Sequence, residues 1–160
     1  MPFEKSAGAI IFKKGRPIKY LLLHYPASNK SARDYWDLPK GHIEKGEKEI
    51  ETVEREVKEE TGLRNIKIAE EFKEWIKYFF KHKGKTIFKI VTFYLAESKT
   101  EKVKISSEHI GFKWLEFDEA VKQLTFENAK KIIKKADDFL NSKFKMQNEN
   151  SKIKIQGKNL

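Results

Sequence analysis

The stretch that decides the fold runs from Gly41 to Leu63 and reads GHIEKGEKEIETVEREVKEETGL. Its second part predicts a helix over residues 47–61. Ile50, Val53 and Val57 recur at i, i+3 and i+7, which places them on one face of a helix where they can pack into a core. The glycine after Thr61 is a typical helix stop, because it adopts the left-handed conformation without steric cost.

Three carboxylates lie on the adjoining face of this predicted helix. Glu56, Glu59 and Glu60 stand at i, i+3 and i+4 and span about 100° of the surface. Like charges at this spacing destabilise a helix, so something must offset their repulsion. A hard divalent cation does so, and oxygen-only ligands select Mg²⁺, or Mn²⁺, over Zn²⁺. A solvated acidic face is the alternative for these three residues taken alone.

Residues around the carboxylates have supporting roles. Glu47 precedes Glu56 by nine residues, about half a turn out of phase, so we expect it to orient other groups rather than to bind the metal equally. Arg55 is expected to fix a carboxylate through a bidentate bond. Gly41 lets the backbone approach a ligand closely.

The rest of the chain alternates between short apolar runs and one further helix. Strands are predicted at residues 7–12, 20–24, 66–69, 72–80, 89–97 and 112–117. The first two runs form one hairpin, and a second hairpin turns around His82–Lys85. A second helix begins near Phe126, with Thr125 as its N-cap. The predicted fold class is α/β (α+β), with a mixed β-sheet between helices.

Composition limits the class of protein. The 160 residues carry a net charge of +10 and contain no cysteine, which excludes a disulfide framework and a thiolate site. No apolar run reaches the roughly 18–20 residues of a membrane span, and no signal peptide is recognisable. We therefore expect a cytoplasmic, monomeric protein without a membrane partner. Residues 1–140 form the predicted domain, and residues 141–160 a basic, polar, mobile tail with Ile153 and Ile155 in a short edge strand.

The spacing pattern over residues 41–63 is far more specific than the three carboxylates taken alone. It reads Gly, five residues, Glu, seven residues, then Arg-Glu-aliphatic-any-Glu-Glu-any-Gly-aliphatic, and residues 41–63 satisfy every position. This is the Nudix box, so the chain resembles Nudix hydrolases. That resemblance implies a Nudix-type α/β/α sandwich and cleavage of a nucleoside diphosphate linked to another moiety.

The resemblance extends over residues 6–140. The segments Trp36–His42, Lys89–Glu97, and Ser107–His109 followed by Phe112–Leu115 look like those of asymmetrical diadenosine tetraphosphate hydrolases. This implies Mg²⁺-dependent hydrolysis of diadenosine tetraphosphate to ATP and AMP. Glu108 resembles the remote carboxylate that assists metal binding or water activation in this family.

The candidate site residues fall into three groups. The expected metal ligands are Glu56, Glu59, Glu60 and the Gly41 carbonyl, and the expected catalytic residues are Arg55, Glu56, Glu59 and Glu108. Either Glu59 or Glu108 serves as the general base. The expected substrate-binding residues are Lys40 and Lys89 as phosphate clamps, Tyr78, Phe79 or Phe112 as a base-stacking ring, Trp36 as a pocket wall, and His42 and His109 as phosphate donors.

Other functions remain open at this level. The charge and the basic tail also suit an RNA 5′ end, so an RNA 5′-pyrophosphohydrolase is an alternative. A nucleoside triphosphate pyrophosphohydrolase, acting for instance on an oxidised nucleotide, or an enzyme acting on an inositol pyrophosphate would use the same box. A non-catalytic nucleotide sensor is the alternative from another class of protein, and the intact carboxylates argue against it.

Overall fold

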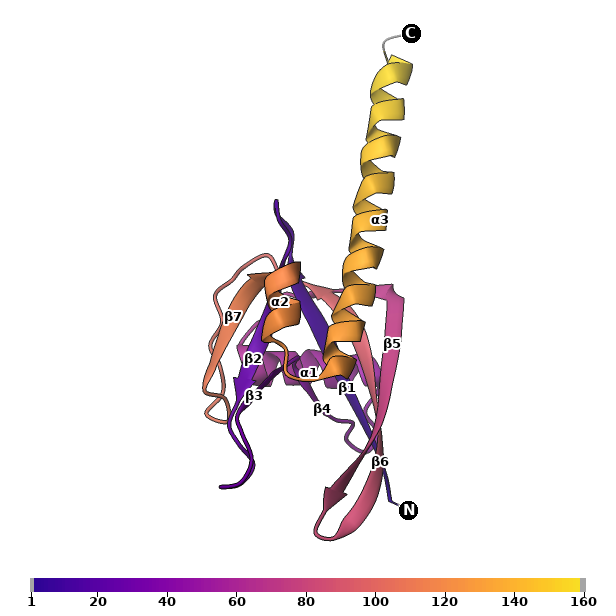
Figure 1. The fold of residues 1–160 in the computed structure, drawn as a ribbon. Helices are drawn as coiled ribbons and strands as arrows, with labels where there is room; N and C mark the ends of the chain where they lie inside the picture. Colours follow the sequence, from indigo (N-terminus) through magenta and orange to yellow (C-terminus); the bar gives the residue numbers. More distant parts are fainter. Residues whose placement is uncertain (1, 159–160) are drawn as a thin grey trace.

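The computed structural model describes residues 2–158, which form a sheet covered by helices on both faces (Figure 1). The elements are β1 Phe3–Lys13, β2 Lys19–Tyr25, β3 Tyr35–Asp37, β4 Lys40–His42, α1 Glu49–Thr61, β5 Lys67–His82, β6 Lys85–Glu97, β7 Gly111–Glu116, α2 Phe117–Gln123 and α3 Glu127–Lys158. The predicted α/β/α sandwich is confirmed.

The sheet is mixed, as predicted. Its main order is β3-β2-β1-β6-β5, while β4 pairs with β1 and β7 pairs with β2. β1 and β6 run parallel over ten register pairs, from Phe3–Phe88 to Phe12–Glu97, and the other pairings are antiparallel. β1 is therefore the central strand to which both hairpins and the short β4 are attached.

Two hydrophobic cores result from the alternation of side chains along the strands. Ile10 of β1 faces the core formed with α2 and α3, which includes Phe93 and Ile132. Its neighbour Ile11 faces the opposite core, which α1 closes with Val53 and Val57. The central strand is apolar on both faces for this reason.

Both predicted hairpins are present. β1 and β2 pair only near their turn, at Phe12–Tyr20 and Lys13–Lys19. The turn between β5 and β6 consists of Lys83 and Gly84, whose φ values are 51° and 74°. Two consecutive positive φ values are typical of a two-residue hairpin turn. The two strands predicted at 66–69 and 72–80 are one strand with an irregularity between Ala69 and Lys73.

The structure differs from the prediction at the start of the first helix and in several short elements. α1 begins at Glu49 rather than residue 47, and it ends at Gly62 as predicted, with φ of 73°. α2 and the short strands β3 and β4 were not predicted, because three to seven residues carry too little periodicity. The predicted N-cap at Thr125 is wrong, because α3 begins at Glu127 and the Phe126 carbonyl accepts its first hydrogen bond. The Thr125 hydroxyl instead accepts a hydrogen bond from the Trp36 backbone N–H at 2.8 Å and ties the segment before α3 to β3.

The predicted edge strand at Ile153 and Ile155 is wrong. α3 continues through both residues to Lys158 and projects beyond the sheet (Figure 1). Phe144 packs against the core and Lys143 pairs with Glu71 at 2.6 Å, so the body holds the helix beyond residue 140. From there a run without proline, in which glycine occurs only at 157, allows the helix to propagate. The boundary proposed at residues 140 and 141 falls inside this helix.

No helix within residues 2–158 combines the length and hydropathy needed to span a bilayer.

The close packing of β1 on β4 yields a stability prediction. A Cβ at Gly8 would overlap the Pro39 carbonyl oxygen and lie 2.8 Å from Lys40 Cβ and 2.9 Å from Phe93. Gly8→Ala should therefore lower the free energy of unfolding by about 1–3 kcal/mol, measured by urea denaturation. Gly111→Ala is the matched control on a strand, because nothing lies within 4 Å of its Cβ position. An equal, small effect of both substitutions would contradict the packing of Gly8.

Candidate active site

The three carboxylates of α1 differ sharply in exposure. Glu60 is buried, Glu56 is half-buried and Glu59 is exposed. Val53 and Val57 on the adjoining helix face are fully buried in the core under the sheet. This packing fixes the rotation of α1, so that Glu56 and Glu60 face the short strand β4.

Glu60 is the most strongly perturbed acid of this group. Burial, and then the charge of Glu56, raise the pKa of Glu60 to about 8. The Tyr25 hydroxyl lies 3.4 Å from Glu60 Oε2, and His109 Nε2 lies 3.9 Å from Oε1. Burial also raises the pKa of Glu56. Two crowded carboxylates of this kind favour a shared positive ligand.

Gly41 gives these carboxylates room. A Cβ at this position would overlap the Glu56 carboxyl group, so any other residue would displace Glu56. Lys40 and Gly41 are consecutive on β4, and the Lys40 backbone lowers the pKa of Glu60, against the larger effect of burial. The predicted close approach at Gly41 is thus made to a side chain of the same site.

Arg55 organises the acidic groups, as predicted. Its Nε donates to Glu47 Oε2 at 2.8 Å and its Nη2 donates to Glu47 Oε1 at 3.0 Å, a bidentate pair. Its Nη1 donates to Glu56 at 2.7 Å and to Glu59 at 3.3 Å, and Nη2 also donates to the His42 carbonyl at 2.9 Å. One guanidinium therefore joins the helix to the preceding loop.

A metal ion fits the chemistry of this donor set. Glu56, Glu60 and the Gly41 backbone offer oxygen atoms only, which suits a hard divalent cation. Within residues 2–158, however, no three Asp, Glu, His or Cys side chains converge as a ready-made metal cage. Arg55 holds Glu56 and Glu59 through the same nitrogen atom, whereas Glu60 is buried more deeply.

A second, basic cluster lies on the face of the sheet that α2 and α3 cover. Lys40 bonds to Asp37 at 2.8 Å, and its ammonium lies 5.9 Å from the centre of the Tyr78 ring. Lys89 is opposite Tyr78 in the β5–β6 register. Burial, followed by the charge of Lys40, lowers the pKa of Lys89. The structure thus brings Lys40, Lys89 and Tyr78 together.

The predicted histidines and the remote acid have different environments. His109 is buried beside Glu60, its Nε2 has no hydrogen-bond partner within residues 2–158, and its Nδ1 lies 2.8 Å from Ser106 Oγ. Burial lowers the pKa of His109. His42 is exposed, with its ring 3.9 Å from Glu4. Glu108 is exposed on the loop beside His109.

The candidate aromatic residues do not gather at one place. Phe112 lies on β7 and Tyr78 on β5, at opposite edges of the sheet. Phe79 projects to the face opposite Tyr78, since side chains alternate along a strand. Trp36 stacks on His24, with the ring centres 4.4 Å apart, and Lys113 lies over it. Of the proposed stacking rings, only Tyr78 lies beside the two lysines.

Sequence reasoning missed three residues of the site: Tyr25, Tyr35 and Asp37. Tyr25 stacks on Tyr35 at 5.0 Å and meets His109 edge-on at 4.6 Å. Asp37 precedes Lys40 by three residues, a spacing that offered a weak signal for their ion pair. Both tyrosines lie outside the predicted strands, whereas the structure pairs them across β2 and β3, so nothing in the sequence placed them opposite each other.

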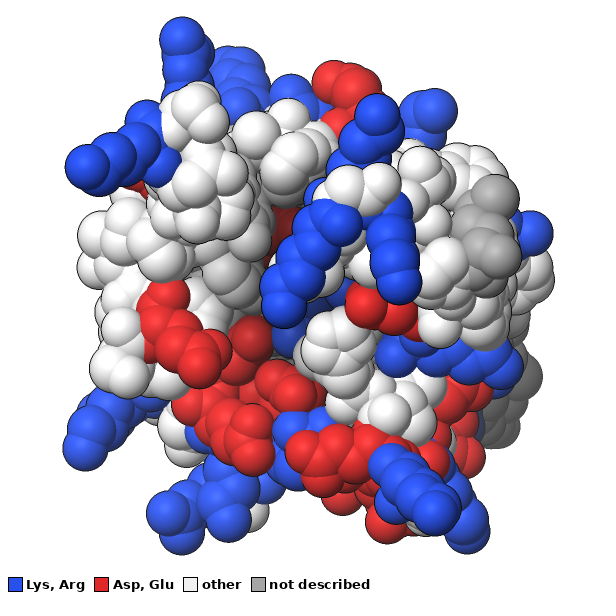
Figure 2. All heavy atoms as spheres, turned by 90° about the horizontal axis from the view of Figure 1, so that it is seen from below, with Lys and Arg blue, Asp and Glu red and all other residues white. Residues whose placement is uncertain are grey.

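Acidic and basic side chains separate on the face seen from below. Figure 2 shows Asp and Glu gathered in one region, with Lys and Arg beside it and around the rim. Such a boundary suits a ligand that carries both bound cations and negative phosphates.

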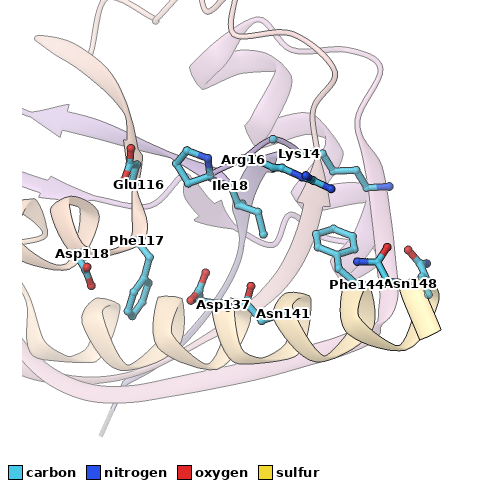
Figure 3. A pocket seen from close by; sticks show the side chains of 13 residues that line it. Lys14, Arg16, Ile18, Glu116, Phe117, Asp118, Asp137, Asn141, Phe144 and Asn148 are labelled. Atoms are coloured by element: carbon cyan, nitrogen blue, oxygen red, sulfur yellow. Dashed lines mark hydrogen bonds between the residues drawn. The ribbon is translucent and has the colours of Figure 1, made fainter. Parts of the chain in front are cut away.

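A groove of about 730 Å³ lies elsewhere, between the loop after β1 and helix α3. Arg16, Ile18, Phe117, Asp137 and Phe144 are among the residues that line it (Figure 3). None of the predicted site residues borders this groove. Its size therefore does not make it the candidate active site.

A comparison with protein families matches the NUDIX domain over residues 2–136. The chain belongs to the Nudix family. This assignment agrees with the glycine, arginine and carboxylate contacts around α1. The family match covers both helical layers but ends before the projecting part of α3.

Among individual relatives, the asymmetrical bis(5′-nucleosyl)-tetraphosphatase of Rattus norvegicus is 34% identical over 147 residues, covering 85% of this Nudix chain and 95% of the relative. A crystal structure of a C. elegans Ap4A hydrolase binary complex is 33% identical, with a TM-score of 0.73, covering 87% of this chain and 98% of that one. The RNA pyrophosphohydrolase of Bartonella clarridgeiae is 33% identical over 82 residues, covering 50% of this chain and 47% of the relative.

The Arg55–Glu47 pair yields a titration prediction. Hydrogen bonds from Arg55, and then from Thr52, lower the pKa of Glu47 to about 2 from an ordinary 4.5. The folded value lies below the unfolded one, so the pair stabilises the fold above about pH 4.5, and this contribution is lost as the pH falls towards 2. Arg55→Gln should raise the pKa of Glu47 towards 4.5, as followed by carboxyl ¹³C NMR.

Lys58→Gln is the control for this titration, because it removes one positive charge from an exposed position of the same helix. It should leave the Glu47 titration almost unchanged. A low pKa that survives in Arg55→Gln would mean that Arg55 is not its cause.

Proposed function

We propose that this protein hydrolyses dinucleoside polyphosphates, with diadenosine tetraphosphate giving ATP and AMP. The observation that carries the proposal is the position of β4 between two charged groups. Its Gly41 lies against the Glu56 carboxyl group, its Lys40 backbone influences the pKa of Glu60, and the Lys40 ammonium lies 5.9 Å from the centre of the Tyr78 ring. A polyphosphate lying across β4 would meet metal-binding oxygens at one end and ammonium groups at the other.

Glu56, Glu60 and the Gly41 carbonyl would hold Mg²⁺ or Mn²⁺, with Glu59 as a further ligand. When bound, such an ion polarises phosphoryl oxygens and lowers the pKa of a coordinated water. Arg55 would act as a positioning residue, since its bonds to Glu47 and Glu56 fix the carboxylates before substrate arrives. This preorganisation lowers the cost of reaching the reactive geometry.

The proton of the attacking water needs an acceptor. We favour Glu59 over Glu108, because Glu59 shares the Arg55 Nη1 atom with Glu56, whereas Glu108 lies on a loop and its backbone N–H donates to the Ser106 hydroxyl. Glu108 stays the alternative base. His109, buried against Glu60, would restrict the movement of that carboxylate.

The basic cluster would bind the rest of the substrate. Lys40 and Lys89 are half-buried, so they would interact with phosphate more strongly than surface lysines. Tyr78 would stack a base beside them, in line with base–aromatic stacking elsewhere. Trp36, His42 and Phe112 would make peripheral contacts to the nucleotide. A monomeric state and a cytoplasmic location stay predictions.

Removal of one carboxylate tests the metal site. Glu60→Gln should lower kcat by at least a hundredfold without unfolding the protein, because an amide binds Mg²⁺ much more weakly than a carboxylate. Glu54→Gln is the matched control at an exposed position of α1 and should keep wild-type turnover. Near-normal turnover in Glu60→Gln would remove Glu60 from the mechanism.

The substrate itself is tested by a panel in H₂¹⁸O. Diadenosine tetraphosphate should give equal amounts of ATP and AMP, with the label in only one of them, because water attacks a single phosphorus. Omission of divalent metal should abolish the reaction. Two molecules of ADP, or preferential hydrolysis of nucleoside triphosphates, would contradict the proposed specificity.

An RNA 5′ end is the second candidate substrate. It is supported by the similarity to RNA pyrophosphohydrolases over half of the chain and by the net charge of +10. RNA carrying a 5′-triphosphate belongs in the same panel, and pyrophosphate release faster than dinucleotide hydrolysis would favour it.

A further inference from the structure

One face of the β5–β6 hairpin is exposed although it carries large aromatic rings. Lys73, Trp75, Lys77, Phe79 and Lys81 occupy every second position of β5, and all five are exposed. Trp75 is 55% and Phe79 62% exposed. The intervening residues of β5 are more buried, so this alternation leaves one face without a covering layer.

The aromatic rings continue across three strands. Phe79 is opposite Phe88 on β6, and Phe88 is opposite Phe3 on β1. The ring centres are 5.0 Å and 5.5 Å apart, and Phe3 is half exposed. An apolar row of this kind in contact with water marks an interaction surface rather than a core.

Lysines flank this row on the same face. Lys77 and Lys5 both lie opposite Ile90 of β6, which is two residues from Phe88 and on the same face. Lys81 is two residues from Phe79 on the other side and also shares this face. The Lys5 ammonium is 5.8 Å from the centre of the Phe3 ring. Within residues 2–158, Lys5, Lys77 and Lys81 form no ion pair. Their charge is therefore available to a ligand.

This surface adjoins the candidate active site. The Lys5 carbonyl accepts a hydrogen bond from Ile43 N at 3.3 Å, and Ser6 is opposite His42 of β4. The residue before His42 on β4 is Gly41, which lies against the Glu56 carboxyl group. A long ligand that extends from the carboxylates along β4 would therefore reach these lysines and phenylalanines directly.

We propose that Phe3, Lys5, Trp75, Lys77, Phe79, Lys81 and Phe88 form a platform that binds single-stranded RNA. Exposed rings separated by lysines match a strand in which bases alternate with phosphates, because each ring can stack a base and each ammonium can meet a phosphate. No acidic residue interrupts this face of β5 between Lys73 and Lys81, which argues against a basic peptide as the ligand.

The platform lies outside the polyphosphate site and can be tested without turnover. The platform proposal extends the proposal of an RNA 5′ end as the second candidate substrate. It rests on that proposal only for a role of the platform in catalysis, because RNA binding is measured separately. Loss of the platform would leave dinucleotide hydrolysis standing, and failure of that reaction would leave the binding measurement valid.

Fluorescence anisotropy with a 5′-labelled twelve-nucleotide oligoadenylate measures the binding. Trp75→Leu with Phe79→Leu keeps apolar side chains but removes stacking, and should raise the Kd at least tenfold. Trp75→Tyr with Phe79→Tyr should restore binding to within about threefold of wild type. Thermal melting of each variant checks that it folds, and a variant that does not melt cooperatively is replaced by the corresponding single substitution.

A matched charge control separates the platform from general basicity. Lys77→Gln with Lys81→Gln should weaken binding at least tenfold, whereas Lys131→Gln with Lys145→Gln, at exposed positions of α3, should weaken it less than threefold. Equal effects of both pairs, or no effect of the leucine variants, would overturn the proposal. A change of oligomeric state on aromatic substitution, or tighter binding to anionic phospholipid vesicles than to the oligonucleotide, would also overturn it.

Discussion

The site depends on the crowding of two carboxylates, Glu56 and Glu60, between a helix and a glycine. α1 can hold them there only because Val53 and Val57 anchor its other face in the core. On the opposite side Gly41 leaves space for them, since a methyl group there would overlap the Glu56 carboxyl group and displace it. The electrostatic cost of this arrangement appears in the raised pKa values of both acids. It explains why the same residues are suited to a divalent cation.

The short strand β4 connects this pair of carboxylates to the basic cluster. It joins β1 by only three register pairs, yet its consecutive residues Lys40 and Gly41 reach the basic cluster and the acidic pair. The sheet therefore carries its two sets of charged groups at neighbouring points rather than on distant loops. Arg55 completes the arrangement by tying the helix to the backbone of His42. Rigid elements on both sides keep the charges in place without substrate.

In the outer part of the sheet, the sequence periodicity of β5 can be interpreted only together with its pairing to β6 and the pairing of β6 to β1. The alternation of lysine with aromatic residues along β5 is visible in the sequence, but it predicts only a strand with one polar face. The register with β6 and β1 aligns Phe79, Phe88 and Phe3. The same register separates Phe79 from Tyr78, so two adjacent aromatic residues belong to different surfaces. Their separation decides which of them can meet Lys40 and Lys89.

The sequence alone determined the Nudix box, the carboxylate face of its helix, the two hairpins and the mixed-sheet class, because these depend on local spacing and hydrophobic periodicity. It also predicted the bidentate role of Arg55. Only the tertiary structure decided that Glu60 is buried and Glu59 exposed, that Asp37, Tyr25 and Tyr35 join the site, and that α3 continues past residue 140. Those features depend on contacts between segments far apart in the chain, whose distances no local pattern encodes.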